Sequence, residues 1–142
     1  MADSPHAALA SALDSVGDRW TLLVVAALMS GPRRFGDLQG ELDGIATNVL
    51  SARLKSLEQH RLVSSQPYSE RPLRVVYELT HSGRELAGTL RLLADWGARR
   101  GEAGNAPRHA ACGTPLEATW FCPVCEVPLP DADADADEVH RA

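Results

Sequence analysis

The chain has 142 residues, of which 44% are hydrophobic and 23% charged. These values are typical of one globular domain, or of one domain with a small appendage, and they exclude a wholly disordered chain. The longest apolar run, residues 22–29, is much shorter than the roughly 20 residues that a membrane-spanning helix needs, so no membrane is expected as a partner. The first residues, MADSPH, lack the basic and apolar regions of an export signal, which favours a cytoplasmic location.

The formal net charge of −5 is unevenly distributed along the chain. Residues 1–100 contain 12 basic and 11 acidic residues, whereas residues 101–142 contain 2 basic and 8 acidic ones. Residues 47–74 contain five basic residues against two acidic ones. Because the five carboxylates of the repetitive DADADADE at residues 131–138 equal the whole net charge, that charge does not exclude a nucleic acid as the partner of the preceding domain.

Four helices are expected before residue 60, at about residues 4–17, 18–30, 35–44 and 47–59. The first begins with Ser4-Pro5, a capping residue followed by proline at the first helical position, and the second begins with the capping residue Asp18. Glycine or a Gly-Pro pair ends the first three.

The fourth expected helix has two different faces. Leu50, Leu54 and Leu57 form an apolar stripe. At about 100° per residue, the opposite face carries small, polar and positive side chains and no acidic one. The residues of that face are Asn48, Ser51, Ala52, Lys55 and Gln59.

A β-hairpin with a basic tip is expected after this helix. Apolar and polar residues alternate on both sides of the turn at residues 69–72, and Arg71 and Arg74 lie at or next to that turn. Thr80 then caps a long helix whose apolar stripe includes Leu86, Leu90 and Leu93.

This order of elements predicts a mainly α fold with a small β-hairpin wing, that is, a winged helix-turn-helix. The DNA major groove admits one helix, and a helix that reads it needs small polar residues on its outward side. A solvated helix face and an exposed hairpin would explain each feature separately. The ordered combination favours DNA binding, with Asn48 able to pair with adenine and the wing arginines able to reach phosphates.

Several stretches resemble the HxlR family of bacterial winged-helix regulators, which are relatives of the MarR family. The resemblance covers about residues 7–98, in order. The stretches are DRWTLLVVAAL (18–28), GPRRFGDL (31–38), GIATNVLSARLKSLEQHRLV (44–63), YSERPLRVVYELTHSGREL (68–86) and ADWG (94–97). It implies a homodimeric DNA-binding transcription regulator, usually of nearby genes. We expect sequence-specific binding and repression, although the sequence does not determine the sign of regulation.

The resemblance also implies which residues meet DNA. It places Thr47, Asn48, Ser51, Arg53 and Lys55 on a recognition helix and the YSERP turn in the wing. With the basic residues before the third helix and in the wing included, the DNA-binding candidates are Thr47, Asn48, Ser51, Arg53, Lys55, Arg71, Arg74, Arg33 and Arg34.

The sequence departs from the family pattern at two points. The family usually has Ser where this chain has Ala46, which cannot cap the recognition helix, a loss of about 1 kcal/mol. If Thr47 takes over as the cap, the start of the helix moves by one residue. Several family members sense electrophiles through an N-terminal cysteine, but residues 1–111 contain no cysteine, which excludes that mechanism here.

The segment beyond residue 108 contains an internal repeat. His109-Ala-Ala-Cys112-Gly-Thr-Pro-Leu116 and Cys122-Pro-Val-Cys125-Glu-Val-Pro-Leu129 align without gaps, thirteen positions apart. Three thiolates and one imidazole in pairs spaced by two residues match a structural tetrahedral Zn²⁺ site. We therefore predict a zinc knuckle with the ligands His109, Cys112, Cys122 and Cys125, a connecting strand at Glu117–Phe121, and a fold that depends on the metal.

Other interpretations of this segment remain open. His109 taken alone is a solvated surface residue, and Cys122 with Cys125 could form a redox dithiol, although no βαβ pattern surrounds the pair. An iron site would prefer a fourth cysteine to His109. The functions to compare with a DNA-binding regulator are therefore a protein-binding adaptor that uses the winged helix and the zinc knuckle, and a thiol oxidoreductase that uses Cys122 and Cys125. We expect no enzyme, because the sequence shows neither a nucleophile–base pair nor a phosphate-binding loop.

The predicted organisation is a DNA-binding and dimerisation domain at residues 1–98, a linker at 99–108, the zinc knuckle at 109–129 and a disordered acidic tail at 130–142. Apolar side chains of the first and last helices of the domain should form the dimer contact. They are Leu9, Leu13, Leu86, Leu90, Leu93 and Trp96. The expected partners are an operator in double-stranded DNA, a second copy of the chain and, as an open option, a small-molecule effector.

Overall fold

The structure is a computed structural model that describes residues 6–101 and 106–130. The predicted helix start at Ser4-Pro5, part of the predicted linker and almost all of the predicted acidic tail lie outside the described residues. The chain divides into two compact units, Met1–Leu90 and Arg91–Ala142. Among the helices of the described part, none has the length and apolar character needed to cross a membrane.

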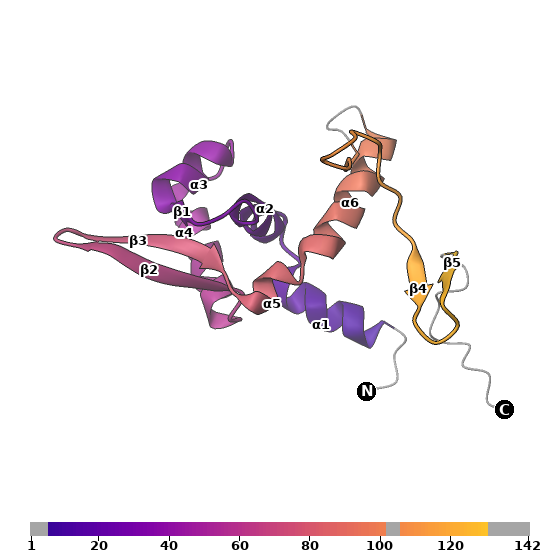
Figure 1. The fold of residues 1–142 in the computed structure, drawn as a ribbon. Coiled ribbons are helices and arrows are strands. Elements are labelled where there is room, and N and C mark those ends of the chain that lie inside the picture. Colours follow the sequence, from indigo (N-terminus) through magenta and orange to yellow (C-terminus); the bar gives the residue numbers. More distant parts are fainter. Residues whose placement is uncertain (1–5, 102–105, 131–142) are drawn as a thin grey trace. The chain divides into compact units, whose positions relative to one another are not determined.

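The first unit is a winged helix-turn-helix, as predicted (Figure 1). A two-residue strand lies between its second and third helices, and a β-hairpin follows its fourth helix. The elements are α1 (Ala7–Val16), α2 (Arg19–Leu28), β1 (Arg33–Arg34), α3 (Phe35–Glu41), α4 (Thr47–Gln59), β2 (Val63–Glu70), β3 (Leu73–Leu79) and α5 (His81–Arg84).

The core of this unit is formed by the apolar sides of α2, α3 and α4. Leu50 and Leu57 have no exposed surface, and Leu54 is 2% exposed, so the stripe predicted for α4 is buried. They belong to one cluster with Val24 and Val25 of α2. Burial of such side chains contributes about 1.5–3 kcal/mol each, which fixes α4 on the core by one face and leaves its other face free.

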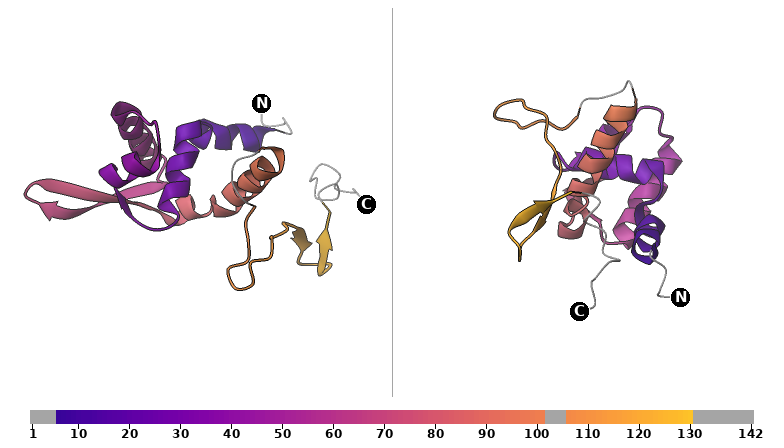
Figure 2. Two further views of the ribbon diagram at one scale, coloured as in Figure 1. Left: turned by 90° about the horizontal axis from the view of Figure 1, so that it is seen from above. Right: turned by 90° about the vertical axis from the view of Figure 1, so that its right-hand side faces the viewer.

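The sheet of the first unit has three antiparallel strands in the order β1-β3-β2. The hairpin β2–β3 extends beyond the helices, as a view from above shows (Figure 2). Strand β1 was not expected from the sequence. It pairs Arg33 with Tyr77 and Arg34 with Val76, so the residues just before α3 are bonded to the wing.

The prediction of one long helix after Thr80 is wrong, because two helices form there. Thr80 does act as a cap, its Oγ1 accepting from the amide of Gly83 at 3.1 Å, but α5 ends at Arg84. The next helix, α6 (Ala87–Arg100), begins three residues later. A Cβ atom at Gly83 would clash with the carbonyl of Leu62, so α5 is held tightly against the chain segment that precedes β2.

The described part of the C-terminal extension is a small β structure without a core. Strands β4 (Trp120–Cys122) and β5 (Val127–Leu129) form an antiparallel hairpin, so the strand expected at Glu117–Phe121 begins later than predicted. No side chain between Pro107 and Pro130 is buried. Trp120 and Phe121 are 55% and 60% exposed, so apolar packing within the extension contributes little to its stability.

Candidate functional site

The outward face of α4 carries four of the predicted DNA-binding residues together. Thr47, Asn48, Ser51 and Lys55 are all exposed; Asn48, Ser51 and Lys55 lie away from the buried leucines of the same helix, and Thr47 lies at its first position. Asn48 and Ser51 are separated by one helical turn, and Lys55 follows one turn later. The arrangement gives one helix face with hydrogen-bonding groups at its N-terminal end and a positive charge further along.

The start of α4 is not shifted by the loss of the capping serine. Ala46 occupies the N-cap position without a side-chain cap, and the helix begins at Thr47. The hydroxyl of Thr47 accepts a hydrogen bond from Gln39 Nε2 of α3 at 2.6 Å. Thr47 therefore links the two helices of the helix-turn-helix and does not replace the missing cap.

Arg53 lies on α4 but differs from the other candidates in its contacts. Its side chain is about one-third exposed, and its Nε lies 2.9 Å from Oδ1 of Asp18, the N-cap of α2. The angle at this contact is not that of a hydrogen bond, so the attraction is ionic. The structure thus places the Arg53 charge between α4 and α2.

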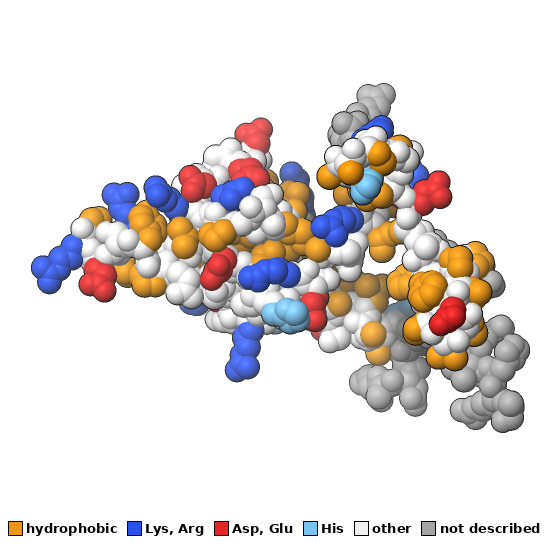
Figure 3. Space-filling view, viewed as in Figure 1, with side chains coloured by type: hydrophobic (Ala, Val, Ile, Leu, Met, Phe, Trp, Pro, Cys, Tyr) orange, Lys and Arg blue, Asp and Glu red, His pale blue; other side chains and the backbone are white. Residues whose placement is uncertain are grey.

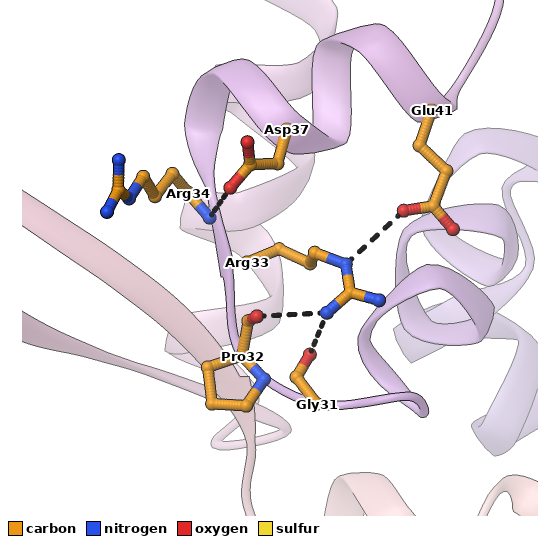
Figure 4. A network of polar contacts seen from close by, with 6 residues as sticks. All are labelled: Gly31, Pro32, Arg33, Arg34, Asp37 and Glu41. Atoms are coloured by element: carbon orange, nitrogen blue, oxygen red, sulfur yellow. Dashed lines mark hydrogen bonds and ion pairs between the residues drawn. The ribbon is translucent and has the colours of Figure 1, made fainter.

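Arg33 and Arg34 are adjacent in β1 but extend in different directions (Figure 4). The Arg33 guanidinium lies 3.4 Å from Glu41 and donates to the carbonyl of Pro32 at 3.1 Å. Arg34 donates only its backbone amide, to Asp37 at 3.1 Å, while its side chain extends away from that network. Arg33 is therefore partly neutralised, and Arg34 is not.

The Arg34 side chain reaches the wing. Its guanidinium lies 4.7 Å from the centre of the Tyr68 ring, at the bulge in β2. A shallow hollow of about 410 Å³ is lined by this pair together with residues of α3 and β3, among them Asp37 and Arg74. Tyr68 was not among the predicted site residues, although an aromatic residue at the start of the YSERP turn is a signal for such stacking.

The wing provides the remaining basic residues of the surface. Arg71 and Arg74 are exposed, and Lys and Arg side chains gather along one edge and the far end of the hairpin (Figure 3). Within the described residues, the side chains of Arg34, Lys55, Arg71 and Arg74 have no carboxylate partner at ion-pair distance. These four charges are free to meet anions.

The four predicted zinc ligands form two pairs in the second unit. His109 Nδ1 lies 3.1 Å from Cys112 Sγ, and the amide of Cys125 donates to Cys122 Sγ at 3.4 Å. Within the described part of the chain, no group of three His, Cys, Asp or Glu side chains is close enough to hold a metal ion. The structure therefore brings each pair together but does not bring the two pairs to one point.

Local hydrogen bonds distinguish the three thiols, none of which forms a disulfide. Bonding to Thr114 lowers the pKa of Cys112 to about 7. The backbone amides of Cys125 and Val124 lower the pKa of Cys122, and the neighbouring Cys122 raises that of Cys125. In the first unit, burial and then the charge of Glu58 raise the pKa of Tyr77.

Comparison with known proteins identifies the family. Residues 15–105 match the model of the HxlR-like helix-turn-helix family. The HTH-type transcriptional regulator Rv3095 of Mycobacterium tuberculosis is 38% identical over 118 residues, which cover 80% of this chain and 74% of Rv3095. The HTH-type transcriptional regulator YodB of Bacillus subtilis is 35% identical over 95 residues, which cover 67% of this chain and 85% of YodB.

Solved structures show the same fold. The reduced form of YodB superposes with a TM-score of 0.59 and 33% identity, covering 70% of this chain and 97% of YodB. The reduced form of the redox regulator HypR gives a TM-score of 0.63 at 26% identity, covering 66% of this chain and 93% of HypR. The chain therefore belongs to the HxlR-like helix-turn-helix family and is a transcriptional regulator with a helix-turn-helix DNA-binding domain.

Proposed function

We propose that the chain is a homodimeric repressor that reads a palindromic operator with α4 in the major groove and contacts the flanking phosphates with its wing. The observation that supports this most directly is the exposed face of α4, where Asn48 and Ser51 lie opposite a fully buried leucine stripe. A helix fixed by its core side can present that face to base edges without rearranging.

Within this proposal the candidate residues have different roles. Asn48 and Ser51 contact base edges, Lys55 meets a base or a phosphate, and Thr47 joins the contact while linked to α3. The unpaired Arg34, Arg71 and Arg74 neutralise phosphates. Arg33 and Arg53, each beside a carboxylate, mainly position α3 and α4, respectively, and add weaker attraction to DNA.

The homodimer is supported by apolar surface on the first and last helices. On α1, Leu9 and Leu13 are 60% and 52% exposed, and on α6, Leu93 and Trp96 are 49% and 54% exposed. Leu86 and Leu90, also predicted to be dimer residues, pack partly against the core of their own unit. A second copy would cover the exposed side chains, and its recognition helix would lie about 34 Å from the first, or a multiple of that distance.

The relatives suggest a regulated protein, and a small-molecule effector is part of the proposal. One solved form of YodB is quinone-bound, and HypR is described as a redox regulator. In this chain all three cysteines lie between residues 112 and 125, so we propose that an effector acts on residues 1–111 through contacts that involve no thiol.

Selection of binding sites from random double-stranded DNA tests this function. The full chain should enrich an inverted repeat, and footprinting should show protected major grooves on one side of the duplex, flanked by wing contacts. Failure to enrich any motif, with the protein folded and dimeric, would contradict sequence-specific recognition and favour the protein-binding adaptor. Repression rather than activation is then tested by placing the enriched site over a reporter promoter.

A further inference from the structure

The two halves of the C-terminal repeat have the same backbone architecture. In the first, the amide of Gly113 donates to the carbonyl of His109 at 2.7 Å, and in the second, the amide of Glu126 donates to that of Cys122 at 2.8 Å. Both donor residues have a positive φ, of 72° at Gly113 and 56° at Glu126. Each half is therefore a tight turn that carries one potential ligand at its first residue and the second at its fourth.

The backbone pairing of the residues that flank each turn is also repeated in register. Arg108 is bridged to Pro115 in the first half, and Phe121 is paired with Pro128 in the second. In both cases, the residue before the first ligand meets the proline six positions after that ligand. The two halves of the sequence repeat thus also share their backbone structure. A chance similarity in cysteine spacing would not require the backbone to repeat as well.

The positive φ at Glu126 indicates that the second turn costs conformational free energy. The left-handed region is open to glycine but unfavourable for most other residues, by roughly 1 kcal/mol or more. Gly113 meets this requirement in the first turn, whereas Glu126 does not in the second. The turn at Cys122–Glu126 therefore needs a stabilising interaction that its own backbone does not provide.

The extension has no apolar core to supply that interaction. All side chains from Pro107 to Pro130 are exposed or half-buried, and the three cysteines form no disulfide. Small units without a core are stabilised by disulfides or by metal ions, and an odd number of thiols cannot all be paired within one chain. Three thiolates and one imidazole are instead a complete ligand set for tetrahedral zinc.

We propose that His109, Cys112, Cys122 and Cys125 bind one structural Zn²⁺ ion, with the two equivalent turns as its two knuckles. This site is separate from the DNA-binding function and does not depend on it. Residues 117–119 connect the two turns and belong to no strand, so this connection is where the backbone would adjust for all four ligands to reach one ion. Four protein ligands leave no position for a reactive water, so the ion has a structural and not a catalytic role.

Metal analysis of the full-length chain, purified under reducing conditions without chelators, tests the proposal. We expect about one zinc per chain and no iron, with X-ray absorption showing three sulfur ligands at about 2.3 Å and one nitrogen at about 2.0–2.1 Å. Cys112→Ser, Cys122→Ser and Cys125→Ser should each reduce bound zinc to near zero. His81→Ala is the matched control and should keep the full amount, since His81 is an exposed histidine at the start of α5.

The role of His109 is tested by two substitutions. His109→Ala should lose zinc, whereas His109→Cys should retain it with four sulfur ligands in the absorption spectrum. Thermal unfolding of the helical unit, which has its own core, should be unchanged in every variant and shows that the loss of metal is local. Zinc-free protein with three reactive thiols after incubation with Zn²⁺, or full zinc in His109→Ala, would overturn the proposed site.

Discussion

Arg53 Nε and Asp18 Oδ1 lie 2.9 Å apart and join α4 to the start of α2. The same carboxylate oxygen caps α2, accepting from the amides of Trp20 and Thr21 at 3.0 and 3.1 Å. The Asp18 side chain therefore caps α2 and also attracts α4 through its ion pair with Arg53.

The coupling between these two residues can be measured. Asp18→Asn keeps an oxygen for the cap but removes the charge, and Arg53→Met removes the partner charge with little change in size. Because the pair is partly exposed, we expect a coupling of about 0.2–1 kcal/mol in a double-mutant cycle of urea unfolding. Asp18→Ala should cost about 1 kcal/mol more than Asp18→Asn through loss of the cap. Strictly additive effects of Asp18→Asn and Arg53→Met would show that the ion pair adds nothing to stability.

Asn48→Ala should weaken binding to the operator but not to unrelated DNA. Asn48 lies one position after the start of α4 on its exposed face, where base edges are within reach. Loss of a bidentate base contact costs about 1–3 kcal/mol at the matching site only. Fluorescence anisotropy with operator and scrambled duplexes measures both affinities. The assignment fails if both affinities drop equally.

Arg71→Ala should weaken binding to every DNA sequence. Arg71 is exposed at the turn of the wing, has no carboxylate partner among the described residues, and is expected to neutralise a phosphate. The slope of log affinity against log salt concentration should therefore decrease by about one. Arg84→Ala removes the same charge from exposed α5 and is the control. Equal changes in slope for Arg71→Ala and Arg84→Ala would show only a general charge effect.

Gly83→Ala should destabilise the first unit, while Gly88→Ala should not. The added Cβ at Gly83 would meet the carbonyl of Leu62, and that backbone can move only by disturbing the buried Leu62 and Val63, so we expect a loss of about 1–3 kcal/mol. At Gly88 in α6, no atom lies within 4 Å of the added carbon, and the change should be neutral or stabilising by up to about 1 kcal/mol. Thermal unfolding of both variants tests this, and similar melting temperatures would contradict the tight contact.

Leu93→Glu should convert the dimer to a monomer. Leu93 is 49% exposed on α6, and a buried carboxylate would oppose a second copy packing on it. Leu73→Glu is the matched control, because Leu73 is 72% exposed but lies in the wing. Light scattering at micromolar concentration should show a monomer for the first and a dimer for the second. A dimeric Leu93→Glu variant would place the dimer contact elsewhere.

The sequence was sufficient for features that depend on local periodicity. The leucine stripe of α4 and the alternating residues of the wing each repeat often enough to identify their element, and the structure confirms both. Strand β1 has only two residues, too few for any pattern, and its existence depends on pairing with β3. The break between α5 and α6 was missed because the apolar stripe continues through it, while the close approach of Gly83 to Leu62 is a contact between distant parts of the sequence.

The same distinction applies to the candidate site. The exposed face of α4 was predicted because the period of a helix alone places those residues on the side away from the leucines. The pairing of Arg53 with Asp18 and the stacking of Arg34 on Tyr68 were not predictable, since both join residues from separate elements.

The pairing of β1 with β3 also limits how this protein can be regulated. Because Arg33 and Arg34 are bonded to the wing and lead directly into α3, the wing cannot swing away from the helix-turn-helix without breaking backbone hydrogen bonds. The wing and the helix-turn-helix therefore form one continuous surface. In the proposed homodimer, we expect release from the operator to follow from a change in the spacing of two such surfaces, so that they no longer match successive turns of the duplex. We expect an inducer of that dimer to change the contact between the two copies.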